Sequence, residues 1–180
     1  MELTDHFLIA TPAMHDTIFS GSVIYITEHQ LHVGAVGVVI NKIVSRTLED
    51  MFKNINISAY NIDWKDNNLF WGGPIKSNNG FFLRKANDMY GSKYELTGNQ
   101  DYLKDIPTVK DGLFMSVGYS SWAPLQLEAE IRCNEWLIVK SNPELIFNLD
   151  PSLRYDEALK MAGIYDLSKL YCDNDILDPM

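Results

Sequence analysis

The amino-acid sequence predicts an α+β protein with a largely antiparallel or mixed sheet. Strand-like runs and amphipathic helical segments are intermixed along the chain, but without the strict strand–helix–strand repeat of a parallel α/β sheet. The chain has 180 residues, of which 46% are hydrophobic and 22% are charged, which is typical of a globular domain. No internal repeat or Pro/Ser-rich linker divides the sequence, so we expect a single domain over residues 1–180.

The first half of the chain is predicted to be rich in strands. Residues 6–10 and 23–27 are β-branched and aromatic runs that are bounded by turn residues. Residues 34–40 are apolar at successive positions, which is typical of a central strand that is covered on both faces. The two glycines of this run, Gly34 and Gly37, leave room for a neighbouring backbone or side chain.

A helix is expected after the third strand, because apolar residues follow at helical spacing. They are Leu48, Met51, Phe52 and Ile55. Residues 56–68 are rich in Asn and Asp and predict an exposed connection. We then expect strands at 69–71, 80–83 and 94–97, with a tight turn at Gly72-Gly73-Pro74.

The second half begins with a predicted strand at residues 112–117. Residues 118–122 predict a turn that leads into a helix near Pro124, since proline is well placed in a first turn. Two opposed apolar stripes on this helix indicate packing between two layers. One stripe is Leu127 and Ile131, and the other is Leu125, Ala129, Cys133 and Trp136. Residues 136–139 predict a further strand.

The last predicted helix has clear signals at both ends. Asp150 can cap it, Pro151 occupies its first turn, and Gly163 supplies a left-handed stop. Its apolar stripe is Tyr155, Ala158, Leu159 and Ala162. The residues beyond it, 165–180, end in an acidic tail that we expect to be solvated.

Charge and cysteine content exclude several classes of function. The chain has 15 basic and 24 acidic residues, for a formal net charge of −9, so its surface repels nucleic acid and anionic lipid. No run approaches the roughly 18 apolar residues that span a bilayer. The N-terminus lacks the basic residues of a secretory signal. Cys133 and Cys172 are isolated, which indicates reduced thiols in a cytoplasmic protein.

The segment that most resembles a catalytic site is Gly118 to Trp122. A serine between a strand and a helix, Ser120, is similar to the nucleophile elbow of hydrolases. The second glycine of that elbow is replaced by Trp122, so a structural role for the serine is favoured over a nucleophile. The glycines of Gly72-Gly73-Pro74 lack the surrounding motif of a phosphate-binding loop, which favours a simple turn.

The four histidines do not predict a metal site. They are His6, His15, His29 and His32, all within the first 32 residues. His29 and His32 could present two imidazoles, but no cysteine pair or second ligand set accompanies them. We therefore expect histidines in turns or at the surface, and neither a metal nor a cofactor.

Several segments, taken in order, resemble the YqgE/AlgH family of bacterial proteins. They are Phe19, Ser22-Val23, Glu28-His29, residues 34–42, Gly72-Gly73-Pro74, residues 118–122, Gln126-Leu127-Glu128, Trp136-Leu137, Arg154 and Gly163-Ile164. The resemblance implies a cytoplasmic protein whose bent, bifurcated sheet forms a pseudo-barrel flanked by helices. It implies no reaction, since the family is largely uncharacterised and one branch is labelled as a transcriptional regulator. This chain departs from the family pattern at Ile43, where proline is common, and at Ser121, where glycine is frequent.

Two functions follow as hypotheses. The favoured one is a non-enzymatic regulatory or interaction protein that acts through a protein partner or a small ligand, with direct DNA binding as its least supported form. The alternative is a small-molecule-binding protein or hydrolase, with Lys42 holding an anionic group. Its pocket residues would be Asn41, Lys42, Gly72, Gly73, Tyr119, Ser120 and Trp122. The alternative requires these segments to converge, with a histidine or acid within hydrogen-bond reach of Ser120. A homodimer is compatible with either hypothesis.

Overall fold

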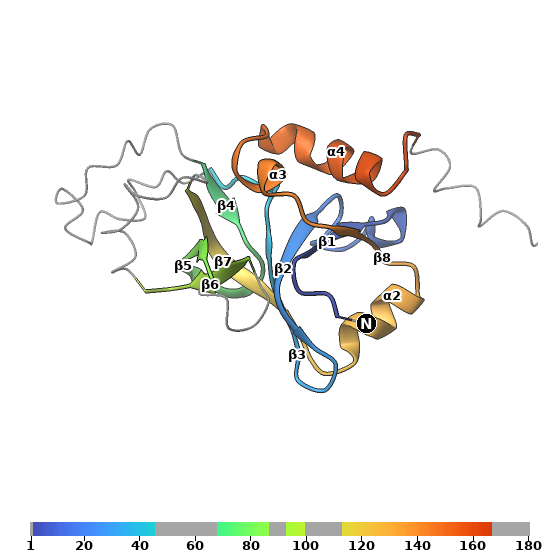
Figure 1. The fold of residues 1–180 in the computed structure, drawn as a ribbon, viewed down its shortest axis with the longest axis horizontal. Helices are drawn as coiled ribbons and strands as arrows, with labels where there is room; N and C mark the ends of the chain where they lie inside the picture. The colour runs from blue at the N-terminus through green and yellow to red at the C-terminus, as the bar shows by residue number, and fades with distance from the viewer. Residues whose placement is uncertain (1, 46–67, 87–92, 100–112, 167–180) are drawn as a thin grey trace, which may run out of the picture.

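The structure, a computed structural model, describes residues 2–45, 68–86, 93–99 and 113–166. In these residues an eight-stranded sheet is covered by helices on both faces (Figure 1). The elements in chain order are β1 (His6–Ala10), the 3₁₀ turn η1 (Pro12–Met14), β2 (Val23–Gln30), β3 (Gly34–Val39), β4 (Leu69–Trp71), β5 (Ile75–Lys85), β6 (Tyr94–Thr97), β7 (Phe114–Trp122), α2 (Gln126–Arg132), β8 (Trp136–Lys140), α3 (Pro143–Phe147), the 3₁₀ turn η6 (Pro151–Leu153) and α4 (Arg154–Met161).

The strands form an open, bent sheet, which confirms the predicted α+β class. Their order is β6-β5-β7-β3-β2-β1-β8, with β4 pairing β7 beside this path. The β4–β7 pair is parallel and all the others are antiparallel, so the sheet is mixed. Three strands separate β6 from β2, yet the rings of Tyr94 and Tyr25 pack edge to face at 6.1 Å. The sheet therefore curls toward the face that carries Tyr25 and Tyr94, and it forms a pseudo-barrel that is not closed.

The sheet divides at β7, where the sequence predicted a turn. Met115 to Val117 pair with β4 and β5, whereas Ser120 to Trp122 pair with β3. Gly118 lies between the two halves at φ +70°. The turn predicted at residues 118–122 is therefore wrong, because the left-handed backbone at Gly118 bends the strand and directs it to a new partner without ending it.

Two hydrophobic cores lie on opposite faces of the sheet, because successive side chains of a strand alternate. In β1, Phe7 and Ile9 face the core beneath α3 and α4, while Leu8 and Ala10 face the core beside α2. Figure 1 shows α4 above the sheet and α2 below it. Helices therefore flank both faces, as the family resemblance implied.

Most of the predicted elements within the described residues are confirmed. The strands at 6–10, 69–71, 94–97 and 136–139 are present, and that at 34–40 ends at Val39. The strands predicted at 23–27 and 80–83 are longer, ending at Gln30 and spanning Ile75–Lys85. Asp150 caps the C-terminal helical segment by accepting a hydrogen bond from the Ser152 backbone at 2.9 Å. The helix predicted around residues 48–55, the connection at 56–68 except its last residue, Cys172 and the acidic tail beyond residue 166 lie outside the described residues.

The helix predicted near Pro124 begins at Gln126 and has one buried face only. Leu127 is buried, but Leu125, Ala129 and Cys133 are exposed. The predicted packing of this helix between two layers is therefore wrong: α2 lies at the surface. Trp136, assigned to the second stripe, belongs to β8.

Candidate functional site

The three segments predicted to frame a pocket lie side by side, joined through their backbones. The carbonyl oxygen of Gly72 accepts hydrogen bonds from the Val39 backbone at 3.0 Å and from Ser120 Oγ at 3.1 Å. The backbone nitrogen of Trp71 donates to the carbonyl oxygen of Lys42 at 2.7 Å. The backbone at the end of β4 is thus hydrogen-bonded both to the end of β3 and to β7.

Ser120 is a structural residue in this arrangement. Its side chain is buried, with 1% of the residue exposed, and its hydroxyl donates to Gly72. A Cβ on Gly73, which has φ +147°, would lie 2.3 Å from Ser120 Oγ, so this backbone covers the hydroxyl. No histidine or carboxylate among the described residues hydrogen-bonds to Ser120. The arrangement therefore supplies the serine with an acceptor but not with a base.

Two other predicted site residues point elsewhere. Asn41 Oδ1 accepts a hydrogen bond from the Val23 backbone and its Nδ2 donates to the carbonyl oxygen of Gly21, both at 2.8 Å. This side chain therefore fixes the loop that enters β2. Tyr119 projects from the face of β7 opposite to Ser120, and its ring packs edge-on against Phe81 at 5.2 Å.

Lys42 lies beside a group of four rings that we call the aromatic cluster: Phe19, Trp71, Trp122 and Trp136. Lys42 Nζ is 5.5 Å from the centroid of the Trp71 ring and donates to the carbonyl oxygen of Ile18 at 2.7 Å. Phe19 joins the three indoles, with centroid distances of 5.8 to 6.5 Å. Burial lowers the pKa of the Lys42 ammonium. Two predicted site residues, Lys42 and Trp122, are thus brought to one cluster.

The aromatic cluster depends on Glu130, for which the sequence offered no specific signal. Glu130 Oε2 accepts hydrogen bonds from the indole nitrogens of Trp122 and Trp136, both at 2.8 Å. Gln126 Nε2 donates to Oε1 of the same carboxylate at 2.9 Å. Buried indole N–H groups need an acceptor, but only the fold shows that one carboxylate on α2 serves both.

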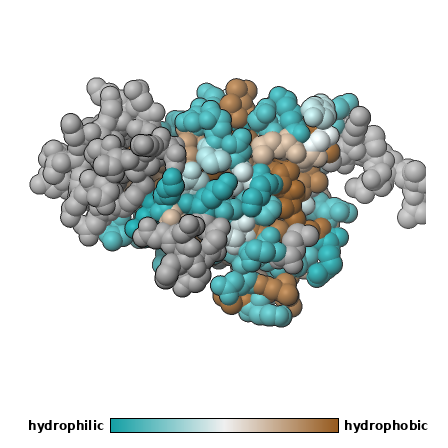
Figure 2. Space-filling view, viewed as in Figure 1, coloured by the Kyte–Doolittle hydropathy of each residue, from teal (hydrophilic) through white to brown (hydrophobic). Residues whose placement is uncertain are grey.

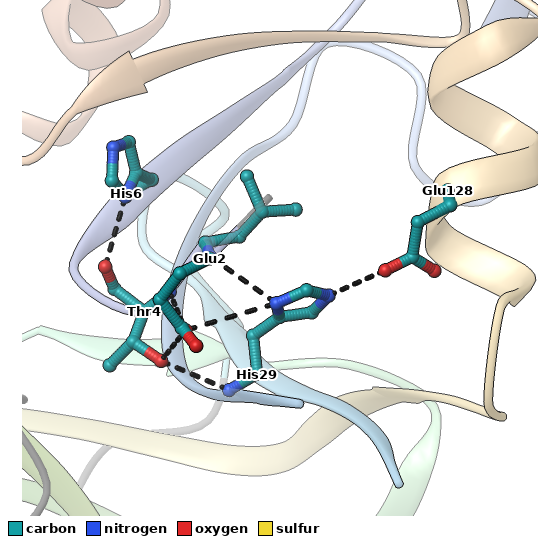
Figure 3. A network of polar contacts seen from close by, with 6 residues as sticks. Glu2, Thr4, His6, His29 and Glu128 are labelled. Carbon is teal, nitrogen blue, oxygen red and sulfur yellow. Dashed lines mark hydrogen bonds and ion pairs between the residues drawn. The ribbon is translucent and has the colours of Figure 1, made fainter. Parts of the chain in front are cut away.

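His29 is buried, with 3% of the residue exposed, so its prediction as a surface or turn histidine is wrong. Its Nδ1 accepts a hydrogen bond from the Leu3 backbone at 3.2 Å, and its Nε2 lies 2.8 Å from Glu128 Oε1 (Figure 3). Because Nδ1 is an acceptor, these contacts assign the proton to Nε2, which donates to Glu128. The cause of the burial is that β2 continues past Thr27 and turns His29 inward beneath α2. His15 and His32 are exposed, as expected.

The Glu128–His29 contact predicts a loss of stability in acid. Burial opposes ionisation of Glu128, but its backbone amide and the His29 ring outweigh burial and hold the pKa of the carboxyl below its ordinary value. A lowered folded-state pKa stabilises the protein above the unfolded pKa, and this stabilisation is lost as pH falls through the folded pKa. We expect Glu128→Gln to lower the free energy of unfolding by about 1 kcal/mol at pH 7. The difference from the native protein should shrink below the ordinary glutamate pKa of 4.5.

Urea unfolding of both proteins at several pH values measures this effect. Glu144→Gln, at an exposed position on α3, is the matched control and should show a smaller difference at pH 7. A Glu128→Gln difference that stays constant from pH 7 to pH 3 would contradict the assignment.

Within residues 2–45, 68–86, 93–99 and 113–166, no three or more His, Cys, Asp or Glu side chains are grouped to hold a metal ion. None of the helices in these ranges is long and apolar enough to cross a bilayer.

Three exposed apolar residues gather at one end of the molecule, and we call them the tip surface: Leu31, Val33 and Leu125. They are 39%, 70% and 49% exposed. The hairpin turn between β2 and β3 lies against the end of β7, since a Cβ on Gly34 would be 2.1 Å from the carbonyl oxygen of Trp122. Figure 2 shows apolar surface at the lower end of the view, where Figure 1 places this hairpin. The tip surface joins the hairpin to the start of α2.

The chain is similar in sequence to one family of bacterial proteins. A family model described as AlgH-like matches residues 7–166. The chain is 38% identical over 176 residues to a UPF0301 protein of Vibrio cholerae, covering 91% of this chain and 94% of that protein. It is 36% identical over 174 residues to a UPF0301 protein of Ralstonia pickettii, covering 91% and 90%.

The fold is also similar to solved structures. The solution structure of the AlgH protein from Pseudomonas aeruginosa superimposes with a TM-score of 0.73 at 30% identity, covering 98% of this chain and 97% of that one. The crystal structure of protein DIP2367 from Corynebacterium diphtheriae gives a TM-score of 0.67 at 20% identity, covering 84% of each chain, which is a likeness of fold alone.

Proposed function

The chain belongs to the AlgH-like family, and from that premise we propose that it is a cytoplasmic, non-enzymatic interaction protein that binds a protein partner through the tip surface. The observation that carries this proposal is Leu125. Its backbone has φ +64°, yet its side chain is half exposed. A left-handed conformation costs a leucine about 1–2 kcal/mol, and strain of this kind is characteristic of functional positions. Here the strain presents an apolar side chain to solvent two residues after Ala123, whose backbone lies against the β2–β3 hairpin at Gly34.

The hydrogen bonding of the polar side chains supports a role without catalysis. Ser120 and Asn41 are bonded to backbone atoms of neighbouring strands and loops. His29 is held between a backbone amide and Glu128. A general base or nucleophile must reach a substrate atom. The polar atoms of these side chains instead form hydrogen bonds within the protein.

The net charge supports a protein partner over nucleic acid. A formal charge of −9 opposes binding to a phosphate backbone, which depends on Lys and Arg contacts. A regulatory role, as the family resemblance implies, would therefore be exerted through another protein.

Small-anion binding at Lys42 is a second candidate. It is favoured by the ammonium of Lys42, which lies over Trp71 at the edge of the aromatic cluster and donates a hydrogen bond to the carbonyl oxygen of Ile18. The same experiment discriminates the two candidates, because it includes a variant of each site.

The test is selection of a displayed random peptide library on the purified full-length protein, followed by affinity measurements with the enriched peptides. We expect Val33→Ser and Leu125→Gly each to weaken binding by about tenfold, the cost of losing one well-buried apolar contact. Leu125→Gly removes the strained conformation and should also raise the free energy of unfolding by about 1 kcal/mol. Weaker binding by a more stable protein cannot be attributed to unfolding.

The matched control is Ile43→Ser, which removes another exposed apolar side chain outside the tip surface and should leave the affinity unchanged. Peptides that bind less tightly to the Lys42→Gln variant, but equally well to Val33→Ser and Leu125→Gly, would favour the second candidate. Failure to enrich any peptide that depends on Val33 or Leu125 would overturn the proposed function.

A further inference from the structure

Charge is distributed unevenly around the tip surface. Residues 2–41 contain no Lys or Arg, and neither do residues 111–131. These two stretches supply the N-terminal segment, the β2–β3 hairpin, the end of β7 and most of α2. The first basic residues that follow them are Lys42, at the far end of β3, and Arg132, at the end of α2.

Carboxylates neighbour the apolar residues in the sequence of both stretches. Glu28 is exposed in β2, on the face of the strand opposite to His29, and precedes by three residues Leu31 in the β2–β3 turn. Glu128 lies three residues after Leu125, in the first turn of α2, with its side chain 15% exposed and one carboxylate oxygen bound to His29. The side chain of Glu2 is 66% exposed, and its Oε1 is 3.8 Å from His29 Nδ1.

Two of these carboxylates, those of Glu2 and Glu128, have lowered pKa values. Burial opposes ionisation of Glu2, but its hydrogen bonds to Thr4 outweigh burial and lower the pKa of the carboxyl. The pKa of Glu128 is lowered as well.

We infer that the tip surface binds a basic amphipathic segment of another protein, with apolar side chains on Leu31, Val33 and Leu125 and Lys or Arg side chains facing the surrounding carboxylates. The inference rests on the proposed function and names its class of partner. A second copy of this chain is a poorer occupant, because a two-fold contact would bring the same carboxylates together. Anionic lipid would be repelled for the same reason.

Three synthetic helical peptides test the inference. They share one apolar face and carry Lys, Gln or Glu at every position of the polar face. We expect the Lys peptide to bind the full-length protein at least about tenfold more tightly than the Gln peptide, and the Glu peptide to bind least. Raising the salt from about 50 to about 300 mM should remove most of the difference between the peptides, since exposed charges are screened.

Variants of single carboxylates show which side chains cause the preference for the Lys peptide. Glu28→Gln should weaken binding of the Lys peptide by about three- to fivefold and leave the Gln peptide unaffected. The matched control, Asp156→Asn, removes an exposed carboxylate on α4 at the other face of the sheet and should change neither affinity.

The outcomes separate this inference from the proposed function. Equal binding of the Lys and Gln peptides, with both weakened by Val33→Ser, would overturn the inference and leave the proposed function standing. A dimer that dissociates on Val33→Ser in sedimentation analysis would also overturn it, because the occupant would be a second copy. Binding of none of the peptides, or binding that Val33→Ser does not change, would count against both.

Discussion

Gly72→Ala is expected to lower the free energy of unfolding by at least about 4 kcal/mol, which is most of the stability of a typical domain. A Cβ at this position would lie 2.2 Å from the carbonyl oxygen of Gly118, 2.7 Å from Ser116 Oγ and 2.8 Å from a methyl group of Val38. The nearest of these atoms belongs to the backbone of β7 and cannot rotate away. Relief would require β4 to move apart from β7 and β3, with loss of the hydrogen bonds of Gly72.

Circular dichroism with urea or heat measures this effect, and Gly21→Ala is its matched control. Gly21 has φ +64° and open space around its Cβ position, so alanine there should cost only about 1 kcal/mol of backbone strain. A Gly72→Ala protein that is as stable as the Gly21→Ala protein would show that the three strands do not approach as closely as the structure has them.

Arg154→Ala is expected to lower the free energy of unfolding by about 3 kcal/mol. The guanidinium is buried, with 4% of the residue exposed, and lies 4.9 Å from the centroid of the Phe70 ring. Its Nε donates to the carbonyl oxygen of Leu149 at 2.9 Å and its Nη1 to that of Ile40 at 2.5 Å. Burial lowers the pKa of Arg154 to about 10, partly offset by Asp150, so the group remains charged at neutral pH. Alanine would leave a cavity and two carbonyl oxygens without their donor.

Two further variants define the contribution of the guanidinium. Arg154→Lys should recover little of the loss, because a single ammonium does not reproduce the two directed donors or the planar contact with Phe70. Lys160→Ala, at an exposed position of the same helix, should change stability by less than about 0.5 kcal/mol. If Arg154→Ala were as mild as Lys160→Ala, the joining of β3 to α4 through this side chain would be refuted.

The strands of this fold could be predicted from the sequence where the hydrophobic pattern is local. Residues 7–10 and 136–139 are apolar at every position, which suffices to place β1 and β8. Gly118 shows where such patterns fail: glycine followed by serines is equally compatible with a turn and with a bend in a continuous strand. The outcome is decided by β3, whose residues pair with Ser120 to Trp122 although they lie some 80 positions earlier in the chain.

The sequence could predict that the segments of the candidate site lie close together, but not which contacts their side chains make. The alternative hypothesis required the segments at 41–42, 72–74 and 118–122 to converge, and their backbones do meet. The bonding of Ser120 to Gly72 and the burial of His29 between Leu3 and Glu128 are long-range contacts, so no local pattern signalled them. The assignment of Lys42 and Trp122 to a ligand site stays a prediction.

The pairing of β1 with β8 sets a constraint on synthesis of the protein. Residues 6–10 hydrogen-bond to residues 136–140, so β1 leaves the ribosome about 130 residues before its outer neighbour. At a translation rate of about 5–20 residues per second, this interval is roughly 6–26 seconds. Throughout it, an apolar strand edge of the nascent chain is open to pairing with other chains. A ribosome that stalls before residue 136 would therefore release a fragment prone to aggregate, and nascent-chain chaperones are the natural protection for this edge.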